Sequence, residues 1–170
     1  MLRLRPLRPD DEAAFRAAHE QMAAEGFPFG LLLEPGRTWE EYLRILADHR
    51  AGVNLPDGWV PSTFLVADVD GQVVGRVSIR HRLNDFLREE GGHIGYGVLP
   101  AYRRRGHATE ILRQALVIAR SVGIDRVLVT CDDDNVGSAT VIEHCGGVFE
   151  SLTENTENPN GALKRRYWID

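Results

Sequence analysis

The order of apolar and polar residues divides the chain into short strands and amphipathic helices. Alternating or continuous apolar runs predict strands near residues 2–4 and at 63–69, 72–80, 93–98, 125–131, 148–152 and 163–169. Helical spacing of apolar residues predicts helices between Asp11 and Gly26, from Thr38 onward, and after residue 106. A further helix is predicted to begin at Asn135, a good N-cap.

Two connections decide the topology that these elements form. The dipeptide Asp70-Gly71 between two apolar runs is a strong hairpin signal, so the strands on either side are expected to pair antiparallel. The unit from 93 to 131 is a strand, a helix and a strand, which favours a right-handed parallel crossover. We therefore predict a mixed α/β fold in one domain, residues 1–170, with a mostly antiparallel sheet and helices on both faces.

The segment from Gly95 to Ala108 carries the clearest chemical signal. A strand ends there in a basic turn, Arg103-Arg104-Arg105-Gly106, that opens directly into the next helix. Helix N-termini normally recruit acidic or hydroxyl side chains, because their free N–H groups are electropositive. Three arginines at this place therefore favour an anion site, and a phosphate group suits their forked donors. The alternative is an ordinary solvated helix start.

Composition limits the size of the anion. The 170 residues carry a formal net charge of −5, with 43% hydrophobic and 26% charged residues, as expected of one ordinary globular domain. An acidic chain is a poor general binder of nucleic acid or anionic membranes, so the basic turn is expected to bind a small ligand.

The two cysteines and the chain start add little chemistry. Cys131 and Cys145 lack zinc-ligand spacing and are expected to be small core residues. The start of the sequence lacks the apolar core of a signal peptide and no stretch approaches a membrane span, so a cytoplasmic protein is expected.

The turn Arg103-Arg104-Arg105-Gly106-His107-Ala108 resembles the Gln/Arg-x-x-Gly-x-Gly/Ala signature of the GNAT superfamily, the acyl-CoA-dependent N-acyltransferases. The order of elements after it is also similar to that family, because a strand at 126–130 precedes an Asn-led helix that ends near Gly146. The similarity covers roughly residue 71 to the end of the sequence.

The resemblance implies how acetyl-CoA would be bound. The backbone N–H groups of the turn would hold the pyrophosphate, and the side chains of Arg103 and Arg104 would meet phosphate oxygens at its mouth. The backbone of Val98 would lie beside the thioester, with Gly95 and Gly97 allowing close approach. Asn135 would fix the pantetheine arm, with Ser138 one turn further on. The pyrophosphate ligands expected are Arg103, Arg104, Arg105, Gly106, His107 and Ala108.

Acyl transfer to an amine also needs a base, because an amine with a pKa of roughly 10 is mostly protonated at neutral pH. His93 begins the strand that leads to the thioester and titrates in the useful range, so we expect it to be the base. Glu89, Glu90 and a water relay are open alternatives.

One position departs from the common family pattern. Ile142 stands seven residues after Asn135, where many members have the tyrosine thought to protonate the leaving thiolate. Isoleucine cannot donate a proton. Cys145, His144 or water could serve instead, the thiolate could leave unprotonated, or the protein could bind acyl-CoA without catalysis.

The sequence therefore predicts an acetyl-CoA-dependent N-acetyltransferase that acts on a primary amine of a small molecule or peptide by direct attack in a ternary complex. A non-catalytic acyl-CoA sensor is the alternative. No metal, nucleic acid or membrane partner is expected, and both monomer and homodimer are open. Four aromatic residues near the N-terminus are candidates for the acceptor pocket or the core, namely Phe27, Phe29, Trp39 and Trp59.

Overall fold

The computed structural model describes residues 1–156 and 158–170. Its helices are α1 (Glu12–Ala23), α2 (Trp39–Ala51), α3 (His107–Ser121) and α4 (Val136–His144). Its strands are β1 (Leu2–Arg5), β2 (Ser62–Val69), β3 (Gln72–Arg80), β4 (Ile94–Val98), β5 (Val127–Asp132), β6 (Val148–Thr153) and β7 (Lys164–Ile169). Short helical turns occur at η1 (Pro9–Asp11), η2 (Leu87–Gly91) and η3 (Pro100–Tyr102), and η2 is π-helical.

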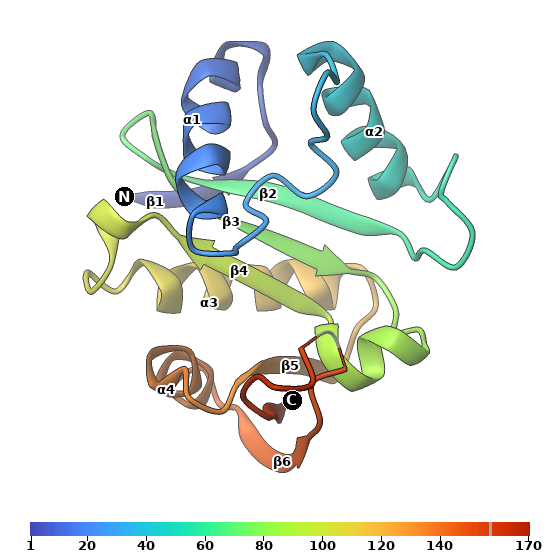
Figure 1. Cartoon of the computed structure of the whole chain (residues 1–170), viewed down its shortest axis with the longest axis vertical. Helices are drawn as coiled ribbons and strands as arrows, with labels where there is room; N and C mark the ends of the chain where they lie inside the picture. The colour runs from blue at the N-terminus through green and yellow to red at the C-terminus, as the bar shows by residue number, and fades with distance from the viewer. Residues whose placement is uncertain (157) are drawn as a thin grey trace.

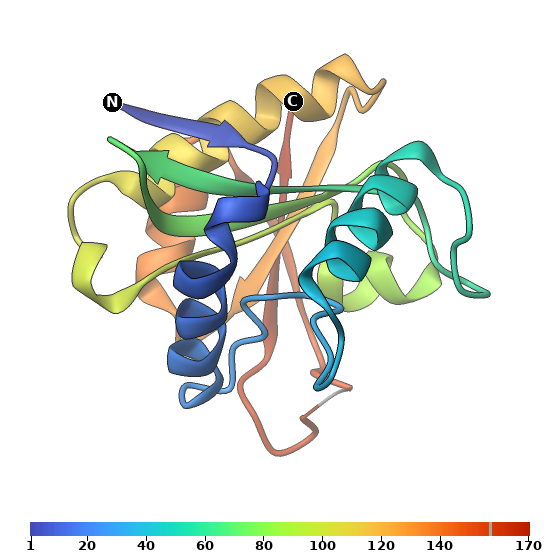
Figure 2. The same ribbon diagram turned by 90° about the horizontal axis from the view of Figure 1, so that it is seen from above.

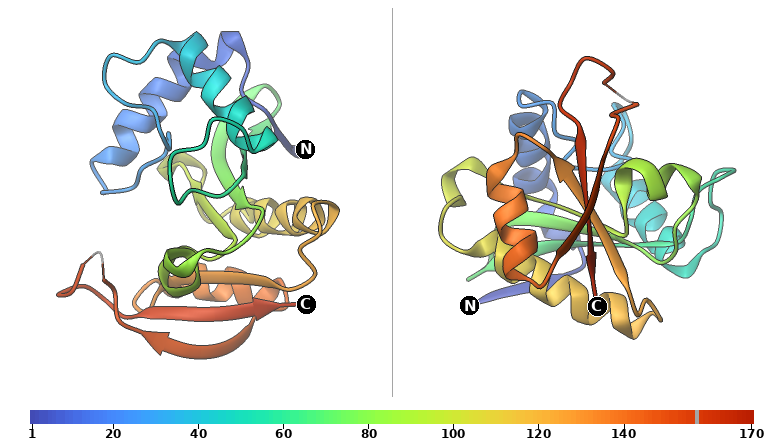
Figure 3. Two further views of the ribbon diagram at one scale, coloured as in Figure 1. Left: turned by 90° about the vertical axis from the view of Figure 1, so that its right-hand side faces the viewer. Right: turned by 90° about the horizontal axis from the view of Figure 1, so that it is seen from below.

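The strands form two antiparallel sheets. The larger sheet has the order β1-β2-β3-β4 and the smaller one β5-β7-β6. Helices α1 and α2 cover one face of the larger sheet, whereas α3 lies on its other face, between the two sheets (Figure 1 and Figure 2). The strands of the smaller sheet run across those of the larger one, as the view from below shows (Figure 3). The predicted fold class is confirmed.

Local sequence signals act where they were predicted. Asp70 and Gly71 both have positive φ, 52° and 86°, as a tight two-residue hairpin requires. The Thr38 side chain accepts a hydrogen bond from the Glu41 N–H, and the Glu41 side chain returns one to the Thr38 N–H. This capping box fixes the start of α2.

The predicted crossover is present, but β4 and β5 separate after their first residues. Helix α3 returns the chain so that β5 starts beside the start of β4. There the His93 N–H donates to the Leu128 carbonyl (2.7 Å) and the Leu128 N–H donates to His93 Nδ1 (2.9 Å). No ladder between the described residues continues this contact, so the expected single mixed sheet is divided into two sheets by a split.

Two hydrophobic clusters hold the layers together. The larger cluster joins β1–β4 to α3 and to the smaller sheet, and it includes the fully buried Ile142. The second joins α1 and α2 to the opposite face of β2 and β3. Phe29 and Trp39 belong to this second core, 0% and 6% exposed, so neither is a pocket residue. Cys131 and Cys145 are both free, Cys131 buried and Cys145 partly so.

A buried ion network fastens β1 to β2 and to the start of α1. The Arg5 guanidinium donates to both Asp11 oxygens (2.7 and 2.9 Å) and to Asp68 Oδ2 (2.7 Å). The hydrogen bonds from Arg5 lower the pKa of Asp11. Burial alone would raise the pKa of Asp68, but hydrogen bonds from Arg5 and the Gly71 N–H lower it overall. The network therefore stabilises the fold with both carboxylates ionised.

We predict that Asp68→Asn lowers the free energy of unfolding at pH 7 by about 3 kcal/mol, because a buried ion pair loses one partner. Both pKa values are lower in the folded state, so this stability is present at neutral pH and is lost as the pH falls below about 5. The variant should therefore lose less stability than the parent between pH 7 and pH 4. Denaturant titration at both pH values measures this, with the exposed turn variant Asp70→Asn as the matched control.

Candidate functional site

The basic turn before α3 has the backbone shape of an anion site. Arg104 and Gly106 have positive φ, 61° and 81°, and such turns direct successive N–H groups to one side. Gly106 is the N-cap of α3 and offers no capping side chain, so the first N–H groups of the helix, including those of His107 and Ala108, are free to meet a ligand. Glycine is needed here for its φ, since a Cβ would meet open space.

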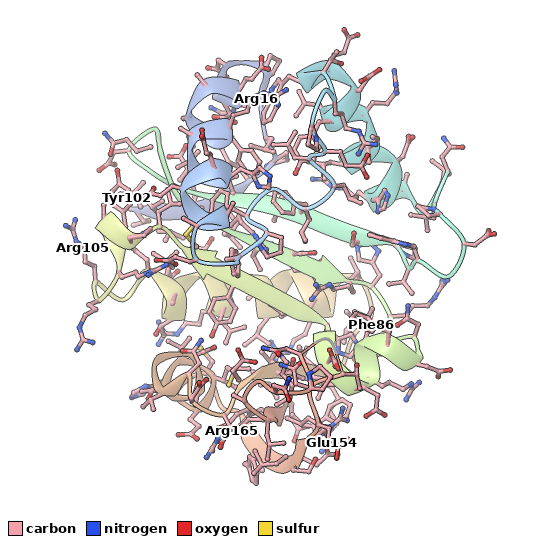
Figure 4. All side chains as sticks on the ribbon, in the orientation of Figure 1. Arg16, Phe86, Tyr102, Arg105, Glu154 and Arg165 are labelled. Atoms are coloured by element: carbon pink, nitrogen blue, oxygen red, sulfur yellow. The ribbon has the colours of Figure 1, made fainter. Side chains whose placement is uncertain are left out.

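The three arginines of the turn are placed differently. Arg104 and Arg105 are exposed, and the Arg105 guanidinium lies 5.9 Å from the centre of the Tyr102 ring, at the edge of the molecule in Figure 4. Arg103 is also exposed, but its side chain donates to the Val98 carbonyl (3.0 Å) and to Glu25 (2.6 Å), two residues after α1. Arg103 therefore joins the turn to the end of α1 by a surface ion pair, and its expected contact with phosphate stays a prediction.

The edge of β4 that faces the split carries free backbone polarity. Val98 lies opposite Gly75, and the Leu99 N–H donates to the Val74 carbonyl. In an antiparallel ladder these positions alternate, so the N–H and C=O groups of Val98 and Tyr96 point away from β3. The Val98 carbonyl accepts from Arg103 (3.0 Å), so the groups that remain for an extended ligand in the split are the Val98 N–H and the Tyr96 N–H and C=O.

Gly95 and Gly97 permit close approach to one face of β4. The groups that approach there are two side chains of this protein, Arg80 and Phe27. A Cβ on Gly97 would lie 2.6 Å from the Phe27 ring. One on Gly95 would lie 3.1 Å from Arg80 Nη1. Phe27 is thus packed against the strand rather than exposed to a ligand.

Two hydroxyl groups meet across the split. The Tyr96 and Ser138 hydroxyl oxygens are 2.9 Å apart, joining β4 to the first turn of α4. Asn135 caps that turn by accepting from the Ser138 N–H (3.1 Å), and its amide NH₂ group takes no part in this bond. Burial raises the pKa of Tyr96 to about 12, so the phenol keeps its proton at neutral pH. The sequence analysis overlooked Tyr96.

The other proposed proton donors are poorly placed. Cys145 Sγ lies 3.7 Å from the Thr109 carbonyl, and burial raises the pKa of its thiol. His144 is exposed and its Nδ1 contacts the Thr140 carbonyl (3.0 Å) within α4. Ile142 packs in the core beneath the split.

His93 does not fit the base role expected of it. The side chain is 6% exposed, and its Nδ1 accepts the Leu128 N–H, which leaves the ring proton on Nε2. Burial and the charges of Arg80 and Arg88 lower its pKa to about 4, so the ring is neutral at pH 7. Its position before β4 reflects a structural role, because it joins β4 to β5.

A cavity of about 600 Å³ lies on the α2 side of the larger sheet; we call it the α2/η2 cavity. It lies between the loop at 28–32, α2, the loop before β2, and the turn η2. Trp59 lines it, as expected for one of the four aromatic residues, and so does Phe86, which Figure 4 labels. Its apolar lining also includes Pro28, Leu31, Leu32, Leu46, Val60, Phe64 and Leu87.

Glu90 supplies the cavity with a carboxylate. It is 6% exposed, its Oε1 accepts from the N–H and hydroxyl of Thr156, and its Oε2 is buried without a partner among the described residues. The loop between β6 and β7 thus contacts Glu90 through Thr156; residue 157 of this loop lies outside the described residues. A π-helical turn such as η2 frequently marks a functional site.

Solved structures share this fold. The chain matches a Salmonella typhimurium protein, yncA, determined with its cofactor acetyl-CoA, at 14% identity and a TM-score of 0.67, over 99% of this chain and 93% of that one. It matches RimL, a ribosomal L7/L12 alpha-N-protein acetyltransferase in complex with coenzyme A, at 18% identity and 0.69, over 99% and 94%. Mycobacterium smegmatis RimJ with CoA-disulfide matches at 25% identity and 0.67, over 99% and 80%.

Comparison with curated protein sequences finds no match. Among the described residues, no helix is long and apolar enough to cross a membrane. The family described as "Acetyltransferase (GNAT) domain" matches residues 1–148, which is most of the chain and includes the basic turn, the split and α4. The chain therefore belongs to the GNAT acetyltransferase family.

Proposed function

We propose that this protein is an N-acetyltransferase that transfers the acetyl group of acetyl-CoA directly to a primary amine. The observation that carries the proposal is the continuity of the split with the basic turn: the free edge of β4 ends where the N–H groups of the turn and α3 converge. That combination suits a ligand with an extended polar arm and a pyrophosphate. The neighbours solved with acetyl-CoA or coenzyme A support the same ligand.

Acetyl-CoA would lie with its pyrophosphate on the turn from Arg104 to Ala108 and its pantetheine arm along β4. The Val98 and Tyr96 N–H groups would pair with that arm and polarise the thioester carbonyl. The Asn135 amide would donate to the arm from the α4 side. No metal takes part in this scheme.

The acceptor amine would enter from the α2/η2 cavity, whose lining includes Arg80, and Arg80 lies against Gly95 near the start of β4. Glu90 Oε2 is the acceptor oxygen that this cavity leaves unpartnered, so it would bind the ammonium and take one of its protons. The neutral nitrogen then attacks the thioester carbon. The two ligands reach β4 from opposite faces, which favours a ternary complex over an acetylated enzyme.

The leaving thiolate would receive a hydrogen bond from the Tyr96 and Ser138 hydroxyl pair as the C–S bond breaks. The second amine proton completes the balance, since it leaves the acetylated nitrogen as the sulfur takes one up. The hydroxyl pair would supply the hydrogen bond to the thiolate that Ile142 cannot donate. For this reason we favour the catalytic function over the sensor alternative.

We predict that the double variant Arg104→Ala/Arg105→Ala binds acetyl-CoA about tenfold more weakly, because charged hydrogen bonds to phosphate are lost while the backbone site remains. Isothermal titration calorimetry with acetyl-CoA measures the dissociation constant. The matched control is Arg44→Ala/Arg50→Ala, which removes the same charge from exposed positions of α2. Equal weakening in both variants would indicate a general charge effect and contradict the site.

We predict that Glu90→Gln lowers kcat/KM for the amine by about 100-fold or more, because the amide cannot accept the proton. The dissociation constant of acetyl-CoA should stay unchanged. Thiol release, followed with a chromogenic disulfide reagent, measures the rate. Glu89→Gln is the matched control, since this neighbouring carboxylate is exposed. A loss of activity in the Glu89 variant instead would move the base to that residue.

We predict that Tyr96→Phe lowers kcat by on the order of 100-fold, because the thiolate loses its hydrogen-bond donor. Burial raises the pKa of Tyr96 to about 12, so the wild-type rate should show no fall from ionisation of this group between pH 7 and pH 10. Tyr167→Phe is the control, because its hydroxyl binds Glu143 and takes no part in the Tyr96–Ser138 contact across the split. Unchanged kcat in Tyr96→Phe would exclude the hydroxyl pair as donor.

A further inference from the structure

The α2/η2 cavity combines apolar walls with charged groups at one end. Its aromatic and aliphatic lining would suit a hydrophobic acceptor, yet Arg80 and Glu90 both border it. Arg80 Nη1 donates to the carbonyl of Gly91 (3.2 Å), the residue after Glu90, so the two residues come from neighbouring parts of the wall. The cavity thus has both a cation and a carboxylate among its lining residues.

Arg80 has no counter-charge of its own. No carboxylate in the described ranges lies within 4.0 Å of its guanidinium, which has only the Gly91 carbonyl as a partner. Burial lowers the pKa of Arg80 to about 10, a direction that a bound anion would reverse. A half-buried cation with one carbonyl partner is costly unless an anion pairs with it.

A second guanidinium increases the positive potential at this face. Arg76 lies on the same face of β3, is 3% exposed, and donates to the carbonyls of Pro28 (2.8 Å), Phe29 (3.0 Å) and Gly95 (3.2 Å). Its bonds hold the loop that forms one wall of the cavity. Its charge also lowers the cost of placing an anion beside Arg80.

Two polar atoms of cavity-lining residues are buried and have no hydrogen-bond partner among the described residues. They are Glu90 Oε2 and His49 Nδ1, in residues that are 6% and 4% exposed. Buried polar atoms in native proteins are almost always hydrogen-bonded, so each marks a position where a water molecule, an ion or a polar group of a ligand can bind. The carboxylate requires a donor such as an ammonium group. The cavity therefore suits a ligand that is apolar except for one charged end.

We infer that the acceptor is a small hydrophobic amine that carries an anionic group beside the amine, as a free α-amino acid does. Glu90 binds the ammonium, Arg80 binds the carboxylate, and the apolar side chain lies among Leu46, Trp59 and Phe86. The inference rests on the proposed function and narrows it, because a peptide amino terminus offers only a neutral carbonyl at the place where Arg80 needs a charge.

Paired probes of equal shape test this inference. Leucine, methionine and phenylalanine are compared with their amides and with the amines that lack the carboxyl group, using acetyl-CoA and thiol release. In the wild type, kcat/KM should be about 10- to 100-fold higher for the best amino acid than for its amide, since a charged hydrogen bond is lost. Higher activity on the amides or simple amines than on the acids would overturn the inference.

Variants of Arg80 separate recognition from folding. Arg80→Gln should abolish the preference for the acid while leaving kcat/KM for the amide within about threefold, and Arg80→Lys should restore part of the preference. Arg82→Gln, at an exposed position two residues away, should change neither. Equal loss on acid and amide in Arg80→Gln would reveal a merely structural role and contradict the inference.

Failure of the proposed function can be told apart from failure of this inference by measuring the binding of acetyl-CoA. Calorimetry with acetyl-CoA is run on the same samples, and absence of binding there would overturn the acetyltransferase proposal itself. Binding of acetyl-CoA with thiol release only from amides or simple amines would keep the enzyme and reject the anionic acceptor. Binding without thiol release from any probe would also count against the anionic acceptor, because a cavity of about 600 Å³ has room for each of the three amino acids.

Discussion

The split between β4 and β5 begins at the point where His93 contacts Leu128. His93 donates its backbone N–H to Leu128 and accepts the Leu128 N–H on its ring, so the two strands are joined at one end. Gly92 makes this approach possible, because a Cβ there would lie 2.6 Å from the Leu128 carbonyl oxygen. Beyond this point Tyr96 and Val98 keep backbone groups free. A continuous parallel ladder would have consumed those groups and closed the proposed acetyl-CoA site.

The elements around the split are tied to it by polar bonds rather than by hydrophobic packing alone. Arg103 links the basic turn to α1, and Arg76 links the loop after α1 to the centre of β3. Thr156 in the loop before β7 binds Glu90 at η2. Arg76 and Glu90 are buried, so their bonds are costly to leave unmade and fix the wall of the α2/η2 cavity, whereas the Arg103–Glu25 pair is exposed.

Charge on the two sides of the larger sheet follows the chemistry proposed for each. In the split, Tyr96 of β4 and Ser138 of α4 present neutral hydroxyls, which suit a thiolate that forms late in the reaction. On the side toward α2, Arg80 of β3 and Glu90 of η2 line the cavity, and they suit a zwitterionic acceptor. Neighbouring charges of opposite sign can each bind a complementary group on one ligand, whereas the apolar cavity wall excludes water from both.

The sequence by itself determined the elements, the hairpin at Asp70-Gly71, the basic turn and the family, because periodicity, turn residues and helix caps act over a few neighbouring residues. The roles of individual side chains were decided by the tertiary structure. Histidine can act as a base, but the buried ring of His93 instead joins β4 to β5. Arg103 belongs to the sequence motif, yet its side chain pairs with Glu25 after α1. Tyr96 and Arg80 carried no local signal, since each acquires its importance from a partner or a cavity more than ten residues away in sequence. The tertiary structure decides which groups a polar side chain contacts, because its burial and its distance from opposite charges depend on the packing of the whole molecule and not on the local sequence.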